Sequence, residues 1–422
     1  GSFASPWKTL LRARDSTKAG DIIYAMDGVT QATNDGSGWH TSMLMRSGGT
    51  PNAPIALVAY PGATVTLGSA SSAGDLLYGL RVTQGGDAWV IAGLRMQGST
   101  SGLDTGGNNW RVVGNVISCP NGDGPTGCVS FSRVSNIKFL GNEITGTAVA
   151  GSSKQYHALY FTTDVNHVEA AWNHIHNNGT CRAVQFHSSP LGGSSGQNQY
   201  DLSVHDNLIH GDACDGINFA TIDPSQGKVE AYNNVIYDVG RGPIPTDGDA
   251  DYACIYFAGS TNNGPAGRGA AHIYNNTFYD CGRRGNSDSG FISIRTGGSL
   301  SFDLKNNIFY SVSSEPYFTA DSDTSTVTGS SNLFFGAGPA PSFLAGNLSG
   351  DPKFVNVDAT NFRLLAGSPA IDAGVNTGIA TDFDGVLRPQ GAGFDLGAFE
   401  FSGGSAAVQP NPPTNLRVLA VK

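Results

Sequence analysis

Charged side chains are scarce in this chain, and it contains no long apolar run. Only 14% of its 422 residues are charged, and 24 basic against 34 acidic residues leave a net charge of -10. No basic run of the kind that follows a nucleic-acid backbone occurs. No stretch approaches the ~20 apolar residues that a membrane-spanning helix requires. We therefore expect neither a nucleic acid nor a membrane as a partner.

Cysteines are few, and none is paired at short spacing. The six cysteines include no Cys-x-x-Cys pair, which argues against a zinc site. An even number of cysteines with few charges is typical of an exported protein with disulfides, although six buried thiols are the alternative. We expect a secreted, extracellular monomer. Gly1 and Ser2 resemble a scar of expression, with any signal peptide already removed.

What the sequence does contain is a loose repeat. Asparagines recur at intervals of 25 to 42 residues, and each is followed two places later by an apolar residue. The repeated asparagines are Asn115, Asn142, Asn173, Asn207, Asn234, Asn276, Asn307 and Asn332. A second segment of the same period alternates apolar and polar residues, which predicts strands. It recurs at 128–131, 158–161, 183–186, 216–219, 254–257 and 291–294.

Short strands that repeat in this way predict an all-β solenoid, in which like strands of successive coils stack about 4.8 Å apart. We expect a right-handed parallel β-helix, its hand following from the general preference of crossover connections. The recurring asparagines would stack at one corner as a ladder that bonds backbone groups left unpaired by the bend.

The two ends of the chain predict how the solenoid is covered. Residues 6–21 can form a short amphipathic helix that caps the open core, and residues 361–401 are expected to close the other end. We therefore divide the chain into a leader (1–4), the β-helix domain (5–402), and a Pro-rich linker with the first strand of a truncated fibronectin type III-like module (403–422).

Two motifs resemble a known family. GDIIYAMDG (20–28) with SGGTPNAPIALVAYPGATVTL (47–67) resembles the first coils of pectate-lyase-like β-helix proteins, most of all the chondroitinase B and alginate lyase group. SPAIDAG, DFDGVLRP and FDLGAFEF, within 368–401, resemble the closing segment of secreted bacterial β-helix proteins. The resemblance implies the fold, and a carbohydrate-active protein that is a lyase, a hydrolase, an epimerase or not an enzyme.

Stacking brings equivalent positions of successive coils into columns, and three coils carry ionisable residues where others carry Ala, Gly, Ser or Tyr. We expect these residues to gather in one region, although the direction of the side chains at the corner stays open. The catalytic candidates are His157, Arg182, His210, Asp212 and Asp215. The substrate-binding candidates are Lys154, Tyr160, His176, Gln185, His187, Asn218, Tyr256 and Arg295.

The longest insertions lie beside these coils, at 188–199, 240–252 and 260–270, and would wall a groove along the helix. Such a groove, with aromatic faces and polar side chains, suits an extended sugar chain. We therefore expect a polysaccharide as the substrate or ligand.

Three functions remain open, and we place a polysaccharide lyase first. A lyase needs a base, for which His157, Tyr160, His210 and Lys154 are candidates, and a cation such as Arg182 or Ca²⁺ beside the uronate carboxylate.

The chondroitinase B-like mechanism uses Ca²⁺ held by acidic residues, but no matching acidic triplet is evident in this sequence. Ca²⁺ therefore stays open as a cofactor, and no metal ligand is assigned. For the acidic residues of the closing segment, Asp382, Asp384, Asp395 and Glu400, we favour contacts with Arg388 and backbone amides.

The alternatives to a lyase are a glycoside hydrolase and a non-catalytic carbohydrate-binding protein. A hydrolase needs two carboxyl groups, for which Asp212 and Asp215 are the best pair. Asp247, Asp249 or Asp251 would be a further carboxyl.

Coil spacing also suggests how the cysteines pair. Cys181 and Cys214 each lie one residue before the corner, one coil apart, which fits the Cα separation of a disulfide. Cys119 and Cys128 flank a short loop, and Cys254 and Cys281 remain. Six cysteines allow 15 connectivities, so this pairing is a hypothesis.

Overall fold

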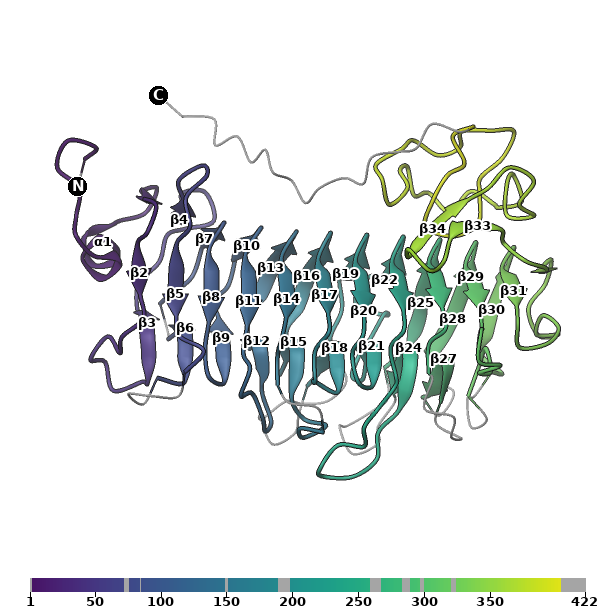
Figure 1. Cartoon of the computed structure of the whole chain (residues 1–422), viewed down its shortest axis with the longest axis horizontal. Coiled ribbons are helices and arrows are strands. Elements are labelled where there is room, and N and C mark those ends of the chain that lie inside the picture. The colour runs from purple at the N-terminus through teal and green to yellow at the C-terminus, as the bar shows by residue number, and fades with distance from the viewer. Residues whose placement is uncertain are drawn as a thin grey trace.

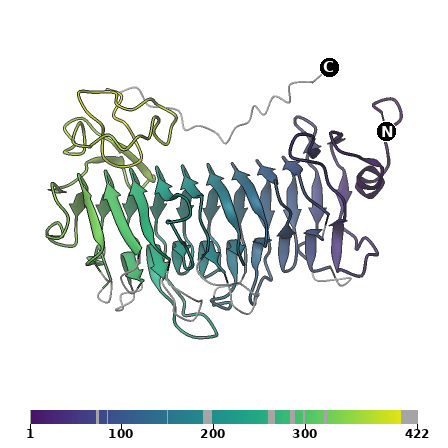
Figure 2. The ribbon, with the colours of Figure 1, turned by 180° about the vertical axis from the view of Figure 1, so that it is seen from behind.

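The computed structural model describes residues 2–71, 76–83, 85–148, 151–188, 198–258, 267–282, 289–296, 300–319 and 324–403. In this part the chain winds into coils that add one strand to each of three parallel sheets, stacked along one axis (Figures 1 and 2). The predicted all-β parallel β-helix is therefore confirmed. No helix among the described residues is long and apolar enough to cross a membrane. Residues 404–422, which hold most of the predicted fibronectin-like segment, lie outside the described residues.

The first sheet contains the strands that precede the asparagine corner. Its strands, in spatial order, are β1 (Ile22–Ala25), β4 (Ile55–Ala59), β7 (Trp89–Ala92), β10 (Arg111–Val113), β13 (Ser135–Leu140), β16 (Asn166–Ala171), β19 (Leu202–His205), β22 (Val229–Tyr232), β25 (Gly269–Tyr274), β28 (Leu300–Lys305) and β30 (Val327–Ser330).

The second sheet follows the asparagine corner and is made of very short strands. They are β2 (Thr30–Gln31), β5 (Thr66–Gly68), β8 (Arg95–Gln97), β11 (Val116–Ser118), β14 (Glu143–Thr145), β17 (His174–His176), β20 (Leu208–His210), β23 (Val235–Tyr237), β26 (Thr277–Tyr279), β29 (Ile308–Tyr310), β31 (Leu333–Phe335) and β32 (Leu348–Ser349).

The third sheet contains the alternating segments that the sequence singled out. Its strands are β3 (Thr41–Met45), β6 (Tyr78–Val82), β9 (Ser101–Gly106), β12 (Gly127–Ser132), β15 (His157–Thr162), β18 (Arg182–His187), β21 (Asp215–Phe219), β24 (Tyr252–Ala258) and β27 (Ser289–Arg295). Its inward side chains include a stack of five phenylalanine rings with centroids 4.8 to 5.4 Å apart. They are Phe131, Phe161, Phe186, Phe219 and Phe257.

The asparagine ladder is present as predicted. In each step, the backbone N–H and the side-chain amide of one asparagine donate to the Oδ1 of the next, as for Asn173 and Asn207 at 3.0 and 2.9 Å. The same amide also donates to a carbonyl of the strand before the corner. The residue before each ladder asparagine has a positive φ, such as 62° at Gly114 and 56° at Trp172. This left-handed residue makes the corner tight.

The ends are covered in two different ways. Helix α1 (Leu10–Ser16) begins after the cap residue Thr9 and buries Leu10 and Ala13 against the first coil, as expected for a cap. Residues 351–401, with the antiparallel strands β33 (Phe354–Asn356) and β34 (Asn361–Leu364), lie over the outer face of the second sheet instead of closing the last coil (Figure 1).

This difference has a physical cause. The outer face of the second sheet carries apolar side chains such as Val235, Ile308 and Leu333, which residues 351–401 bury with Phe362 and Leu396. Within the segment, Arg388 pairs with Glu400 at 2.7 Å, and Asp382 and Asp395 accept backbone N–H bonds. These are the contacts that the sequence predicted for its acidic residues.

Candidate functional site

The outer face of the third sheet carries a column of polar and aromatic side chains. Tyr160 of β15 lies in register with Gln185 of β18, Asn218 of β21 and Tyr256 of β24, as the alternation predicted. The inward neighbours of these residues belong to the apolar core, so parallel pairing directs this column outward. The third sheet therefore presents one aligned polar face over successive coils.

The corner column lies beside it. His157, Arg182 and Asp215 are in register, which confirms that residues 25 to 33 places apart in the chain become neighbours. The residues that follow the first two corner positions, Ala158 and Ala183, are buried in the core. The corner side chains therefore point outward, a direction that the sequence left open. The His157 ring lies 4.6 Å from the ring of Tyr160.

Arg182 and Asp215 form a buried ion pair. The Nε of Arg182 donates to Asp215 Oδ2 at 3.1 Å, and the side chain of Asp215 is fully buried. Asn218 and the backbone N–H of Ala253 also donate to this carboxyl. Burial raises the pKa of Asp215, and the guanidinium of Arg182 opposes the rise. Asp215 thereby fixes the position of Arg182.

The 240–252 loop reaches this corner from a later coil. The Nη1 of Arg182 donates to the carbonyl of Lys154, whose backbone N–H and Nζ donate to Asp247 and to the carbonyl of Asp249. Arg295 pairs with Asp251 at 3.1 Å. The carboxyls of Asp247, Asp249 and Asp251 are therefore all engaged, as is that of Asp215.

Most residues of the other two predicted loops, 189–197 of 188–199 and 260–266 of 260–270, lie outside the described residues. Ca²⁺ is bound by several oxygen ligands, mostly carboxylates and carbonyls. The engaged carboxyls around Arg182 do not offer such a set, so no step below depends on calcium.

Several polar atoms of the column have no hydrogen-bond partner within the described part of the chain. They are Nδ1 of His157, Oε1 of Gln185 and Oδ1 of Asn218, all buried. Unpaired buried polar atoms are costly, so atoms on an outer face that lack a protein partner are suited to a ligand or to water. The hydroxyl of Tyr160 lies 3.4 Å from Nδ1 of His187, which is half-exposed, so the column reaches solvent on that side.

Protonation states on this face are set mainly by burial. Burial lowers the pKa of His157 well below its usual range, with a further contribution from the charge of Arg182, so its imidazole is neutral at neutral pH. Burial raises the pKa of the Tyr160 hydroxyl, which therefore stays protonated. A neutral imidazole, a protonated phenol and a guanidinium thus lie on one face.

The structure does not bring all the predicted residues together. His176 and His210 lie on the outer face of the second sheet, in β17 and β20, whereas His157 and Arg182 lie on the third sheet. Residues 177–181 turn the chain through a corner between β17 and β18, and this separates the two groups. The prediction of a single region was therefore wrong in this respect.

Sequence reasoning missed His174 and Glu143, which lie next to His176 and His210. A signal was present in the sequence. His174 and His176 are two places apart in a strand, so their side chains share one face.

Asp212 is buried at the corner between β20 and β21. Neither of its carboxyl oxygens has a hydrogen-bond partner among the described residues. Burial raises its pKa to about 8, which Asn178 and Thr180 oppose only in part. The Asp215 carboxyl is held by Arg182, Asn218 and the backbone N–H of Ala253, so Asp212 and Asp215 are not a pair of free carboxyl groups of the kind that a glycoside hydrolase requires.

Replacing Asp212 with Asn is expected to remove a pH-dependent loss of stability. In the folded protein the pKa of Asp212 is about 8, above its ordinary unfolded value of ~3.9. The folded state therefore binds more protons between these pH values, and stability falls as pH rises from about 4 to about 8. Thermal unfolding at pH 5 and pH 8 should show Asp212→Asn to be more stable than wild type mainly at pH 8. An equal difference at both pH values would contradict this assignment.

The three expected disulfides are present. Cys181 bonds Cys214, Cys119 bonds Cys128, and Cys254 bonds Cys281. The first joins the residues directly before Arg182 and Asp215, and its two cysteines form a buried cluster with Ala213, Ala250 and Tyr252. This bond therefore ties together the two coils that hold the ion pair.

Comparisons with known proteins support the fold. No family model matches the chain, and no curated protein matches its sequence. The solved structure of pectate lyase Pel9A is similar over 94% of this chain and 92% of its own, with a TM-score of 0.56 and 15% identity. An alginate lyase from Paenibacillus sp. str. FPU-7 is similar over 81% of this chain and 92% of its own, with a TM-score of 0.43 and 18% identity. The likeness to Pel9A is a likeness of fold, and it agrees with the parallel β-helix that the three sheets form.

Proposed function

We propose that this protein is a secreted polysaccharide lyase that cleaves an acidic polysaccharide by β-elimination on the outer face of its third sheet. The observation that carries the proposal is the convergence of His157, Tyr160 and Arg182 on one face of two adjacent coils. β-Elimination requires a base, an acid for the leaving oxygen and a cation beside the carboxylate of the sugar. This face offers one group for each role.

Arg182 binds the uronate carboxylate in this mechanism. Its charge stabilises the electron density that develops when the proton beside the carboxylate is removed. The neutral imidazole of His157 accepts that proton, and the hydroxyl of Tyr160 donates a proton to the oxygen of the broken glycosidic bond. Asp215 acts through Arg182 as a positioning residue.

The remaining residues of the column bind the sugar chain. Gln185 and Asn218 each have an oxygen without a protein partner in the described part of the chain, which can accept from a sugar hydroxyl. Tyr256 offers an aromatic side chain in the same column, three coils from Tyr160. Lys154, His187 and Arg295 lie at the borders of the column and extend its polar surface.

A panel of acidic and neutral polysaccharides tests the proposal. We expect ultraviolet absorbance from an unsaturated product, together with new reducing ends, on at least one acidic polysaccharide. Reducing ends without this absorbance would contradict the proposal and indicate a hydrolase. Binding without any cleavage would contradict it and indicate a carbohydrate-binding protein.

Tyr160→Phe is expected to lower the rate on the cleaved substrate by about 10²-fold or more, because it removes the proposed proton donor. The hydroxyl's contacts with His187 are long, at 3.4 and 3.5 Å, so the variant should remain folded. Tyr232→Phe, on the outer face of the first sheet, is the matched control and should keep the wild-type rate. Equal rates for the two variants would exclude Tyr160 from the chemistry.

A further inference from the structure

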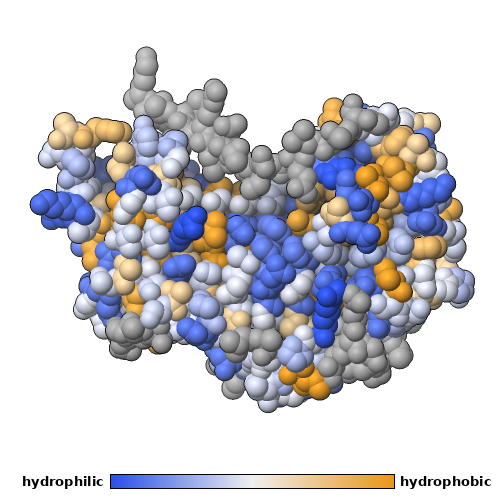
Figure 3. Space-filling view, viewed as in Figure 1, coloured by the Kyte–Doolittle hydropathy of each residue, from blue (hydrophilic) through white to orange (hydrophobic). Residues whose placement is uncertain are grey.

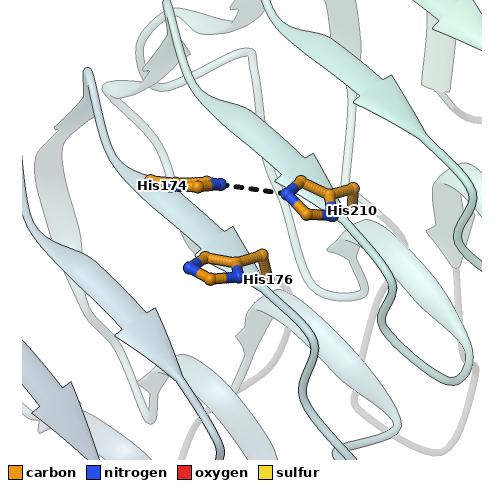
Figure 4. Close-up of side chains that lie close together, drawn as sticks. All are labelled: His174, His176 and His210. Atoms are coloured by element: carbon orange, nitrogen blue, oxygen red, sulfur yellow. Dashed lines mark hydrogen bonds between the residues drawn. The ribbon is translucent and has the colours of Figure 1, made fainter. Parts of the chain in front are cut away.

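Three histidines gather on the outer face of the second sheet, on the other side of the corner from the proposed catalytic face. His174 and His176 extend from β17 with their rings stacked, and His210 extends from β20 beside them (Figure 4). Figure 3 shows a hydrophilic patch in the middle of this face, where β17 and β20 lie in Figure 1. The three side chains are half-buried. The cluster is thus accessible and lies outside the proposed lyase site.

The nitrogen atoms of the cluster are close enough to share one ion. One ligand atom of each histidine lies within 4.8 Å of the other two. The Nε2 atoms of His174 and His210 are 2.9 Å apart, and Nε2 of His176 lies 3.1 Å from Oε1 of Glu143 in β14. Ligand atoms 2.0–2.1 Å from a tetrahedral Zn²⁺ are about 3.3 Å from one another. The ligand atoms of the three histidines are therefore within reach of one ion, and the stacked rings and the Glu143 side chain would turn toward that ion on binding.

The neighbours of the cluster suit a divalent cation. Glu143 supplies a negative charge. Tyr237 stacks on His210 with ring centroids 4.5 Å apart, and Asn177 bonds Nδ1 of His176, so neighbours help to orient these two rings.

The cluster also lies at the border of the closing segment. Tyr237, which stacks on His210, packs on its other side against Phe362 of β34, with ring centroids 5.2 Å apart. Residues 351–401 bury the second sheet from this point toward the last coil. The cluster is therefore the first polar region on this face beyond the apolar cover.

We propose that His174, His176 and His210, with Glu143 as a fourth ligand, form a binding site for a divalent transition-metal ion such as Zn²⁺. Imidazole nitrogen suits Zn²⁺ and its neighbours, and three histidines with one carboxylate match their preferred donor sets. The ligands come from three consecutive coils, in β14, β17 and β20. A bound ion would therefore connect these coils and stabilise the exposed part of the second sheet.

Zn²⁺ binding to the full chain tests this site without any substrate, so its outcome is independent of the lyase proposal. The protein is treated with a chelator, and Zn²⁺ is then titrated in competition with a chromophoric chelator. We expect one equivalent to bind tightly and to raise the thermal unfolding midpoint, since the ion binds only the folded arrangement. Co²⁺ in place of Zn²⁺ should give the visible absorption of a low-coordinate, nitrogen-rich site.

His210→Ala should weaken Zn²⁺ binding by about 100-fold or more, since loss of even an outer partner of a metal ligand costs about 10- to 100-fold. It should also abolish the stabilisation and the Co²⁺ spectrum. His272→Ala, which removes a partly exposed histidine on the first sheet, is the matched control and should bind as wild type does. Circular dichroism of both metal-free variants checks that they fold.

Three results would overturn the proposal. They are no Zn²⁺ uptake by the wild-type protein, equal binding by wild type and His210→Ala, or equal loss in His210→Ala and His272→Ala. If His210→Ala does not fold, Glu143→Gln replaces it. Glu143→Gln should weaken binding without unfolding the chain, because Glu143 is half-exposed.

Discussion

Asn207→Ala is expected to destabilise the protein by about 3–6 kcal/mol and to lower its unfolding midpoint more than any surface substitution. The side chain of Asn207 is buried and lies in the middle of the ladder. Its Oδ1 accepts from the backbone N–H and the amide of Asn173, and its own amide donates to the carbonyl of Ala170 and to Asn234. Alanine leaves these groups without partners inside the solenoid, and each buried orphan costs about 1–3 kcal/mol.

The end of the same ladder provides the control. Asn347 accepts from Asn332 at 3.2 and 3.3 Å, and it is half-buried, so water can replace its side chain. Asn347→Ala should therefore cost less than about 1 kcal/mol. Urea unfolding followed by circular dichroism measures both variants. A similar small cost at the two positions would show that the ladder does not hold the corners.

Arg182→Ala is expected to destabilise the fold by about 3–5 kcal/mol and to abolish turnover. The substitution leaves Asp215, which is fully buried, without its cation, and removing one partner of a buried pair has a cost of this size. The loss of the cation that faces the substrate removes the proposed stabilisation of the developing charge. Unfolding midpoints and rates, measured at a temperature where the variant remains folded, separate the two effects.

The ion pair itself can be isolated with a second variant. Arg182→Ala/Asp215→Ala should be more stable than Arg182→Ala, because no unpaired carboxyl remains. The loss of folding stability in Arg182→Ala should also become smaller as the pH falls. Without Arg182 the folded pKa of Asp215 lies further above its unfolded value, so stability is present at low pH and is lost as pH rises through the folded pKa. A double variant less stable than the single one would show that the unpaired carboxyl of Asp215 is not the main cause of the destabilisation.

Much of the fold could be predicted because the repeat is local and simple. Each coil repeats the same order of short alternating strands, so the spacing of these strands alone aligns Tyr160 with Gln185 and His157 with Arg182. The same spacing gave the pairing of Cys181 with Cys214. Backbone pairing in a solenoid depends on sequence offset, and an offset can be counted.

Other features of the structure do not follow from residue spacing. Alternation does not hold at a corner, where Ala183 and Val184 both point inward and turn Arg182 outward. The angle of the corner after β17 decided that His176 and His210 belong to a different face from His157. The place of residues 351–401 followed from the apolar outer face of the second sheet, which no local pattern relates to that segment.

The sequence by itself determined the winding, the register and the ladder of this protein, because each is fixed by which residue recurs at which interval. Only the tertiary structure decided on which face each ionisable side chain lies and which of them are buried, as His157, Asp212 and Asp215 are. Burial and direction arise from corners and covering segments that meet across long stretches of chain. The pKa of Asp212 and the gathering of His174, His176 and His210 therefore follow from three-dimensional contact and not from spacing alone.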